Sequence, residues 1–243
     1  MFALHCLGAF ILLQIFMPGG SVKNRIIGGK ESDPHSHPYM VYLLNVITNE
    51  TCDGFLVDKD FVMTAAHCGV PILAMIGLHN VFKHLPENMY LIEKYYQHPD
   101  YDNKNFENDI MLLKLSKSAI FSEVVKPVAM PKSENEIFTR HCMVLGWGCQ
   151  TYTNEFPSTV LQEVNITLGS NSSVCTTPGF ICSEGFTGPG KGDSGGPLVC
   201  GNVAHGIVSN NYESKNGYVS RYIRIGYYLN WIQSVIDGTY KAH

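Results

Sequence analysis

The chain has 243 residues, of which 45% are hydrophobic and 16% are charged, and its formal net charge is -4. This length fits one large β domain or two small ones, and the apolar fraction is sufficient for a packed core. The small charged fraction argues against long solvated helices and against a disordered chain. The negative net charge argues against a nucleic-acid binder, which usually has a basic surface.

The first 17 residues are almost all apolar, and a Pro-Gly-Gly-Ser segment follows them at positions 18–21. This stretch is short for a membrane span, whereas a secretory signal peptide has such an apolar stretch before small residues at its cleavage site. We therefore expect a signal peptide over residues 1–21, with an approximate end. An uncleaved membrane anchor is the alternative.

Short runs typical of β-strands recur along the rest of the chain, separated by Gly, Pro and Asn, and they predict an all-β fold with hairpin and Greek-key connections. The runs are 40–44, 61–64, 72–76, 110–113, 142–145, 164–168, 197–200 and 204–208. The segment 128–134 resembles a linker between two halves. Four apolar residues near the end have helical spacing, namely Leu229, Ile232, Val235 and Ile236. They predict a C-terminal amphipathic helix that serves packing only.

The segment Gly192–Pro197 (GDSGGP) places Ser194 between glycines and directly after an acid. A serine hydroxyl becomes an effective nucleophile only when a base takes its proton and backbone N–H groups face the oxyanion that forms. Such a segment alone also fits a glycine-rich turn. Two further segments favour the catalytic interpretation, because TAAHC contains His67 and NDIMLL contains Asp109. The order His67, Asp109, Ser194 differs from the orders of subtilisin and of α/β-hydrolases and matches the chymotrypsin type.

Each of these residues has a distinct expected role. Ser194 is the candidate nucleophile, and His67 is the candidate base because histidines ordinarily titrate near working pH. Asp109 would fix the tautomer of the imidazole and stabilise the imidazolium that forms. The backbone N–H groups of Gly192 and Ser194 would form the oxyanion hole.

The chain resembles secreted trypsin/chymotrypsin-type serine proteases, and more narrowly the granzyme and mast-cell chymase branch. The matching segments run from residue 26 to the end of the chain and comprise Ile26–Gly29, 64–68, 108–113, Gly146–Gly148, 191–200 and His205–Ser209. The resemblance implies two six-stranded antiparallel Greek-key β-barrels with a C-terminal α-helix. The N-terminal barrel would span about 26–130 and the C-terminal barrel about 131–243. The active site would lie in the cleft between them, without a metal or other cofactor.

Asp193 requires a partner, because burying a carboxylate is costly unless it is paired. The resemblance implies that this partner is the α-amino group of Ile26, which cleavage after Arg25 would generate. Residues 22–25 then form a short activation propeptide. Granzymes commonly carry an acidic dipeptide there, whereas the basic Arg25 favours a trypsin-like activating protease.

The expected specificity pocket is not that of a trypsin. Trypsins carry an aspartate at the pocket base, where this chain has Gly188 followed by Pro189, so a basic substrate residue loses its charge partner. Ser209 matches the residue that binds the substrate backbone. Asn210 and Asn211 replace the usual Trp-Gly pair, and we expect Asn211 to narrow the pocket entrance.

Two alternatives remain for the residue before the scissile bond. Counting back from Trp231 places Ser220 on the rear wall with Arg221 beside it, which favours a neutral, medium-sized or aromatic residue. A one-residue slip would direct Arg221 into the pocket and favour acidic residues. Lys191 at the rim would also attract acid.

Seven of the eight cysteines follow the signal region, and spacing alone does not define their pairing. The family resemblance implies disulfides Cys52–Cys68, Cys142–Cys200 and Cys175–Cys182, which agree with export. Cys149 is left over. We expect it to be a partly buried thiol, with an intermolecular bridge, and hence a dimer, as the alternative.

Three Asn-x-Ser/Thr sequons, at Asn49, Asn165 and Asn171, predict N-glycosylation in an exported chain. Each also fits an unused chance match.

Together these features predict a secreted serine endopeptidase, made as a zymogen and secreted or stored in secretory granules. Its expected partners are protein or peptide substrates, an activating protease and serpin-type inhibitors, but neither nucleic acid nor a membrane, and we expect a monomer. One rival is a catalytically silent homologue that acts as a binding protein, which the Asn210-Asn211 pair weakly favours. Another is a membrane-anchored adhesion domain, which would require residues 1–17 to stay uncleaved.

Overall fold

The computed structural model describes residues 26–71, 73–149 and 157–241. The expected signal peptide over 1–21 and propeptide over 22–25 lie outside these residues. Among the described residues, none forms a helix with the length and hydropathy that a membrane span requires.

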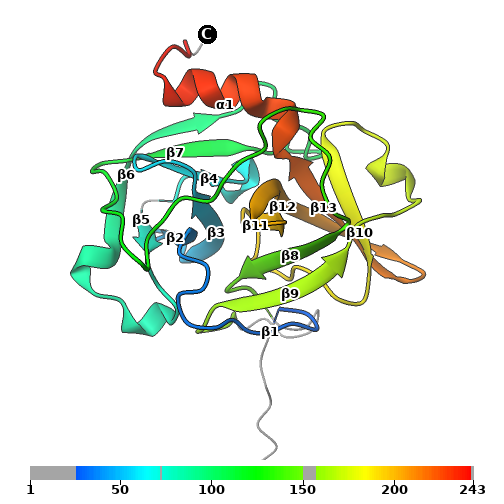
Figure 1. Ribbon diagram of the computed structural model, residues 1–243, viewed down its shortest axis with the longest axis horizontal. Helices are drawn as coiled ribbons and strands as arrows, with labels where there is room; N and C mark the ends of the chain where they lie inside the picture. Colours follow the sequence, from blue (N-terminus) through cyan, green and yellow to red (C-terminus); the bar gives the residue numbers. More distant parts are fainter. Residues whose placement is uncertain (1–25, 72, 150–156, 242–243) are drawn as a thin grey trace, which may run out of the picture.

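The N-terminal half forms a closed antiparallel barrel with the strand order β2-β3-β4-β7-β6-β5 (Figure 1). Its strands are β2 (Met40–Asn45), β3 (Glu50–Leu56), β4 (Phe61–Thr64), β5 (Leu73–Ile76), β6 (Met89–Gln97) and β7 (Met111–Leu115). Every residue of β4 is buried, and only one residue of β7 is partly exposed. Their nearly continuous apolar runs fit strands that are covered on both faces.

The C-terminal half forms a seven-stranded antiparallel sheet with the order β1-β9-β8-β11-β12-β13-β10. Its strands are β1 (Lys30–Glu31), β8 (His141–Gly146), β9 (Gln162–Thr167), β10 (Phe180–Gly185), β11 (Pro197–Cys200), β12 (Val203–Ser214) and β13 (Gly217–Arg224). An isolated bridge joins Leu168, the residue after β9, to Ser183 on β10, so strands near the two ends of this strand order also meet.

The expected all-β fold with a C-terminal helix is confirmed, with one difference in the strand count. The second half has seven strands because β1 pairs with β9, so a segment from the start of the chain joins the second sheet. The expected domain limits therefore stay a prediction.

The helix α1 (Leu229–Ile236) covers the junction of the two halves (Figure 1). Its residues Ile232 and Val235 are each only 1% exposed, and they pack in a core that includes Phe55 and Leu112 from the first barrel and Ile223 from the second sheet. The short 3-10 helices are η1 (Ala66–Cys68), η2 (Val81–Lys83), η3 (Pro86–Asn88), η4 (Ser173–Cys175) and η5 (Ile225–Tyr228).

Candidate active site

The candidate catalytic residues come from both halves of the molecule. His67 lies on η1, directly after the buried strand β4, and Asp109 lies two residues before β7. Ser194 lies in the loop between β10 and β11 of the second sheet. The fold thus brings together three residues that the sequence separates by up to 127 positions.

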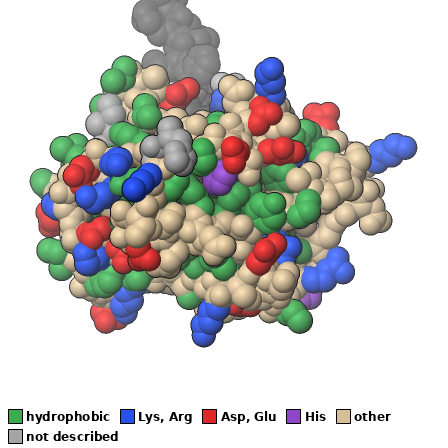
Figure 2. All heavy atoms as spheres, turned by 90° about the horizontal axis from the view of Figure 1, so that it is seen from above, with side chains coloured by type: hydrophobic (Ala, Val, Ile, Leu, Met, Phe, Trp, Pro, Cys, Tyr) green, Lys and Arg blue, Asp and Glu red, His purple; other side chains and the backbone are tan. Residues whose placement is uncertain are grey.

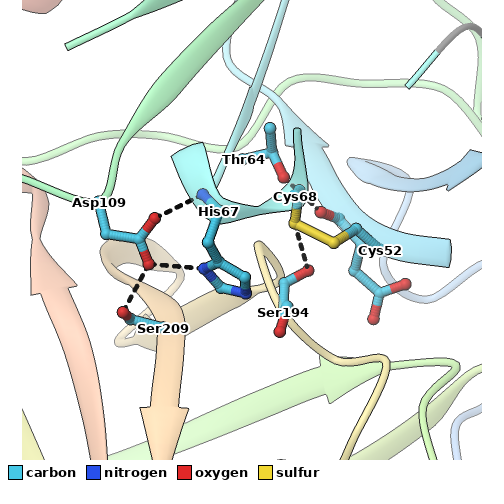
Figure 3. The surroundings of a disulfide bond; sticks show 8 residues. Cys52, Thr64, His67, Cys68, Asp109, Ser194 and Ser209 are labelled. Atoms are coloured by element: carbon cyan, nitrogen blue, oxygen red, sulfur yellow. Dashed lines mark hydrogen bonds and ion pairs between the residues drawn. A yellow bond between two sulfur atoms is a disulfide. The ribbon is translucent and has the colours of Figure 1, made fainter. Parts of the chain in front are cut away.

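Asp109 fixes the orientation of the His67 ring. The Nδ1 atom of His67 lies 2.7 Å from Asp109 Oδ2, and the backbone N–H of His67 donates to Asp109 Oδ1 at 2.8 Å. The hydroxyl of Ser209 donates to Asp109 Oδ2 at 2.6 Å, and the carboxylate is fully buried. In Figure 3 the imidazole lies between Asp109 and Ser194, so its second nitrogen is left for the serine. The family resemblance places Ser209 at the substrate backbone, whereas its contact with Asp109 has no signal in the sequence.

A disulfide holds this turn against the first barrel. Cys52 on β3 is joined to Cys68 on η1, next to His67 (Figure 3). The other disulfides are Cys142–Cys200 and Cys175–Cys182, so the three pairs are those that the family resemblance implied. Cys149 forms none of these disulfides and is only 3% exposed, which argues against a bridge to a second chain.

Two glycines let the serine loop approach its neighbours closely. Gly192 has φ +99°, and a Cβ there would lie 3.0 Å from the Cα of Gly148. Gly195 has φ +83°, and a Cβ there would lie 2.1 Å from Oγ1 of Thr64. Within the described residues, no acceptor takes the backbone N–H of Gly192 or of Ser194. Both N–H groups therefore remain available to an oxyanion.

Asp193 is fully buried beside the serine and is held by two backbone amides. Gly148 N–H donates to its Oδ1 and Gly190 N–H donates to its Oδ2, each at 2.7 Å. Burial raises the pKa of Asp193, and these two hydrogen bonds oppose that rise. A second fully buried acid, Asp53 on β3, lies next to it. The pKa of Asp53 is raised well above its usual range, mainly by burial and secondly by the charge of Asp193. The sequence does not single out Asp53; its one signal is an acid that follows Cys52 and comes shortly before the apolar pair Phe55-Leu56.

The start of the described chain lies against this loop. Ile26 is fully buried in the core of the second sheet. Ile27 forms an isolated bridge with Gly188, and Gly188 N–H donates to the carbonyl of Ile27 at 3.1 Å.

Several expected pocket residues come together around Gly188. A Cβ on Gly188 would lie 3.3 Å from Ser220 Oγ, so the serine hydroxyl faces the position where trypsins carry an aspartate. The side-chain amide of Asn211 donates to the carbonyl of Pro189 at 2.8 Å, which links β12 to this loop. Lys191 is exposed and, with His67 and Ser194, lines a cavity.

Arg221 points elsewhere. Successive side chains of a strand point to opposite faces, so Arg221 and Ser220 diverge on β13. Its guanidinium donates to Asn210 Oδ1 at 3.0 Å and to the carbonyl of Asn105, and it stacks 3.8 Å from the ring centroid of Phe180. Arg221 is 6% exposed, so it occupies an interior site between loops of both halves.

Phe106 is a further residue that sequence reasoning missed. It follows Asn105, has φ 61°, and packs edge-on against the imidazole of His67 with ring centroids 5.6 Å apart. A positive φ is unusual for a bulky residue, so the surrounding contacts must hold this loop. No motif around Phe106 in the sequence predicts its contact with the His67 ring.

The three sequon asparagines, Asn49, Asn165 and Asn171, are all exposed. Their side chains are therefore accessible to modification.

A His–Asp pair on one antiparallel β structure that faces a serine on a second one defines a chymotrypsin-type serine hydrolase. The trypsin family model matches residues 26–232. Granzyme H of Homo sapiens is 36% identical over 92% of this chain and 96% of its own length. Cathepsin G of Mus musculus is 39% identical over 92% of this chain and 88% of its own length. Duodenase-1 of Bos taurus is 37% identical over 93% of this chain and 94% of its own. The chain therefore belongs to the trypsin family, and it is a serine endopeptidase.

Proposed function

We propose that this endopeptidase cleaves peptide bonds through His67, Asp109 and Ser194. Nε2 of His67 takes the hydroxyl proton as Ser194 Oγ attacks the peptide carbonyl, and the imidazolium then gives that proton to the leaving amine. A water molecule releases the acyl group by the same route in reverse. The N–H groups of Gly192 and Ser194 bind the oxyanion. The observation that carries this proposal is the buried Asp109 carboxylate, which orients His67 beside Ser194.

Labelling by an active-site fluorophosphonate tests this assignment. Ser194→Ala should abolish both the labelling and the turnover, whereas Ser116→Ala removes an exposed hydroxyl and should change neither. Full peptidase activity of Ser194→Ala would reject the assignment.

We infer that the enzyme is made as a zymogen that is activated by cleavage between Arg25 and Ile26. The buried position of Ile26 and the bridge of its neighbour Ile27 to Gly188, five residues before Asp193, support this inference. The new ammonium would pair with Asp193 and fix the oxyanion loop, because a buried carboxylate gains most from a nearby opposite charge. Arg25→Gln should give a folded but nearly inactive protein. Activity equal to that of the processed wild type would reject this activation route.

The proposed specificity is for a neutral side chain, medium-sized or aromatic, before the scissile bond. Gly188 offers no carboxylate to a basic residue, and the guanidinium of Arg221 is engaged with Asn105 and Phe180. The hydroxyl of Ser220 and the bridge from Asn211 to Pro189 give a neutral pocket of limited size. Profiling of the activated enzyme on a peptide library tests this preference, and efficient cleavage after Lys or Arg would overturn it.

We propose that the protein is secreted or stored in secretory granules and acts as a monomer on protein or peptide substrates. Three disulfides favour an oxidising compartment. Its further proposed partners are an activating protease and serpin-type inhibitors, and the exposed Asn49, Asn165 and Asn171 are proposed glycosylation sites.

A further inference from the structure

Asp53 is in direct contact with the catalytic loop although it belongs to the other barrel. Its backbone N–H donates to the carbonyl of Ser194 at 2.8 Å, and its own carbonyl accepts from the hydroxyl of Thr64 at 2.8 Å. Any residue except proline at this position could make these backbone bonds. The side chain therefore requires a separate explanation, because its carboxyl is fully buried.

The carboxyls of Asp53 and Asp193 are close together. A Cβ on Gly146 would lie 2.1 Å from Asp193 Oδ1 and 2.2 Å from Asp53 Oδ2, so these two oxygens are at most 4.3 Å apart. Asp53 Oδ2 accepts from Trp147 N–H at 3.1 Å, but no donor among the described residues reaches its buried Oδ1. Two carboxylates at this distance resist ionising together, so the pair retains a proton.

No exposed charge nearby replaces that proton. The exposed charged side chains on the segments around the pair are Lys30, Glu31, Glu50 and Lys191. The buried Glu163 on β9 is already paired with Lys30 and His37, and Tyr42, opposite Asp53 on β2, is neutral because burial and the Asp53 charge raise its pKa. The 146–149 segment contributes backbone amides and the buried Cys149 side chain.

We propose that Asp53 is a positioning residue of the catalytic loop, which shares one proton with Asp193 until the ammonium of Ile26 replaces that proton. This proposal rests on the activation route proposed above. In the uncleaved chain, one carboxyl and one carboxylate together carry a single negative charge. When the ammonium arrives, the shared proton leaves to solvent. Two carboxylates and one ammonium then carry the same net charge.

The pH dependence of stability follows from this sharing. The folded uncleaved chain holds one proton on the pair, and the unfolded chain releases this proton at a lower pH. Stability contributed by such raised pKa values is fully present below the unfolded value and is lost as pH rises through the folded value. Burial raises the pKa of Asp193 to about 7, so the loss extends over weakly acidic to neutral pH.

The test compares thermal unfolding of uncleaved protein, as the Arg25→Gln variant, between about pH 5 and about pH 8. The midpoint should fall by several degrees over this range, and the additional change Asp53→Asn should make the fall smaller, because Asp193 no longer has a second carboxylate whose repulsion retains the proton. Asp33→Asn, an exposed acid, is the matched control and should leave the fall unchanged. Equal falls with and without Asp53→Asn would overturn the proposal.

If Asp53→Asn does not fold, carboxyl carbon NMR titration of the uncleaved Arg25→Gln protein decides. One raised apparent pKa that is seen at two coupled buried carboxyls supports proton sharing, whereas aspartates that all titrate near about 4 reject it.

The cleaved enzyme gives an independent readout. Loss of the second carboxylate should lower the pKa of the Ile26 ammonium. The alkaline limb of the kcat–pH profile of cleaved Asp53→Asn should therefore lie about one pH unit lower than that of the cleaved wild type. An unchanged alkaline limit would overturn the role of Asp53 in holding the ammonium. An inactive cleaved wild type would instead reject the proposed function. The unfolding measurement needs no substrate, so it would still test proton sharing between Asp53 and Asp193.

Discussion

The His67–Asp109 pair is the most closely constrained contact at the residue scale. Asp109→Asn preserves the shape of the carboxyl but removes the charge and favours the wrong imidazole tautomer. We expect the fold to be unchanged and kcat to fall by about 10⁴-fold. Steady-state kinetics with a matched unfolding curve measure both quantities. A normal kcat in a correctly folded variant would exclude Asp109 from the mechanism.

Arg221 gives a second prediction at this scale. Arg221→Met keeps much of the side-chain volume but removes the hydrogen bond to the Asn105 carbonyl. The loop that carries Phe106 beside His67 then loses a support. We expect lower stability and a higher KM for neutral substrates, with the neutral-over-acidic preference unchanged in a peptide library. A selective loss of cleavage after Asp or Glu would place the guanidinium in the specificity pocket instead.

The sequence predicted those functional residues that sit in contiguous motifs. His67, Asp109 and Ser194 each have a distinctive neighbourhood, so their types and order indicated the chemistry. Asp53 and Phe106 have no such neighbourhood, because their roles arise from contacts between the two halves. The orientation of Arg221 depended on the β13 register, which counting from Trp231 could place only to within one residue.

At the scale of elements, the sequence predicted the strands with compact apolar runs and missed several of those with polar interruptions. The strands β4, β7 and β11 coincide with expected runs to within two residues. The strand β3 contains Asp53 and Gly54, and β13 contains Ser220 and Arg221, so neither has a clear apolar pattern. Asp53 and Arg221 each contact the other half of the molecule, where tertiary contacts override local propensity.

The helix α1 stabilises both halves, because its Ile232 packs in the core that they share. Ile232→Ala leaves a cavity there and should cost about 2–5 kcal/mol of unfolding free energy. The exposed Asn230→Ala on the same helix is the control and should change stability by no more than about 0.5 kcal/mol. Chemical denaturation measures both variants. A cost for Ile232→Ala within the control's range would show that the helix is dispensable.

At the scale of the whole molecule, the cleft between the halves has two different sides. Acidic and basic side chains are interspersed on the face shown in Figure 2, which fits the modest net charge of -4. The pocket around Gly188 and Ser220 lies on one side of Ser194. On the other side, a cavity of about 740 Å³ is lined by His67, Ser194 and several apolar side chains, namely Tyr42, Leu44, Met75, Val81 and Phe82.

A substrate that places its residue before the scissile bond at Gly188 must extend its leaving-group side into this cavity. Phe82 is 79% exposed there, so an apolar substrate residue can bury its ring. Phe82→Ala should lower kcat/KM about tenfold for peptides with an apolar residue after the scissile bond, since burial of a large side chain contributes about 1.5–3 kcal/mol. Short substrates that end in a small leaving group should be cleaved as by the wild type. Phe121→Ala is the control, because Phe121 is half-exposed and does not line the cavity. An equal loss of kcat/KM for short and long substrates in Phe82→Ala would show that Phe82 does not contact the leaving-group side.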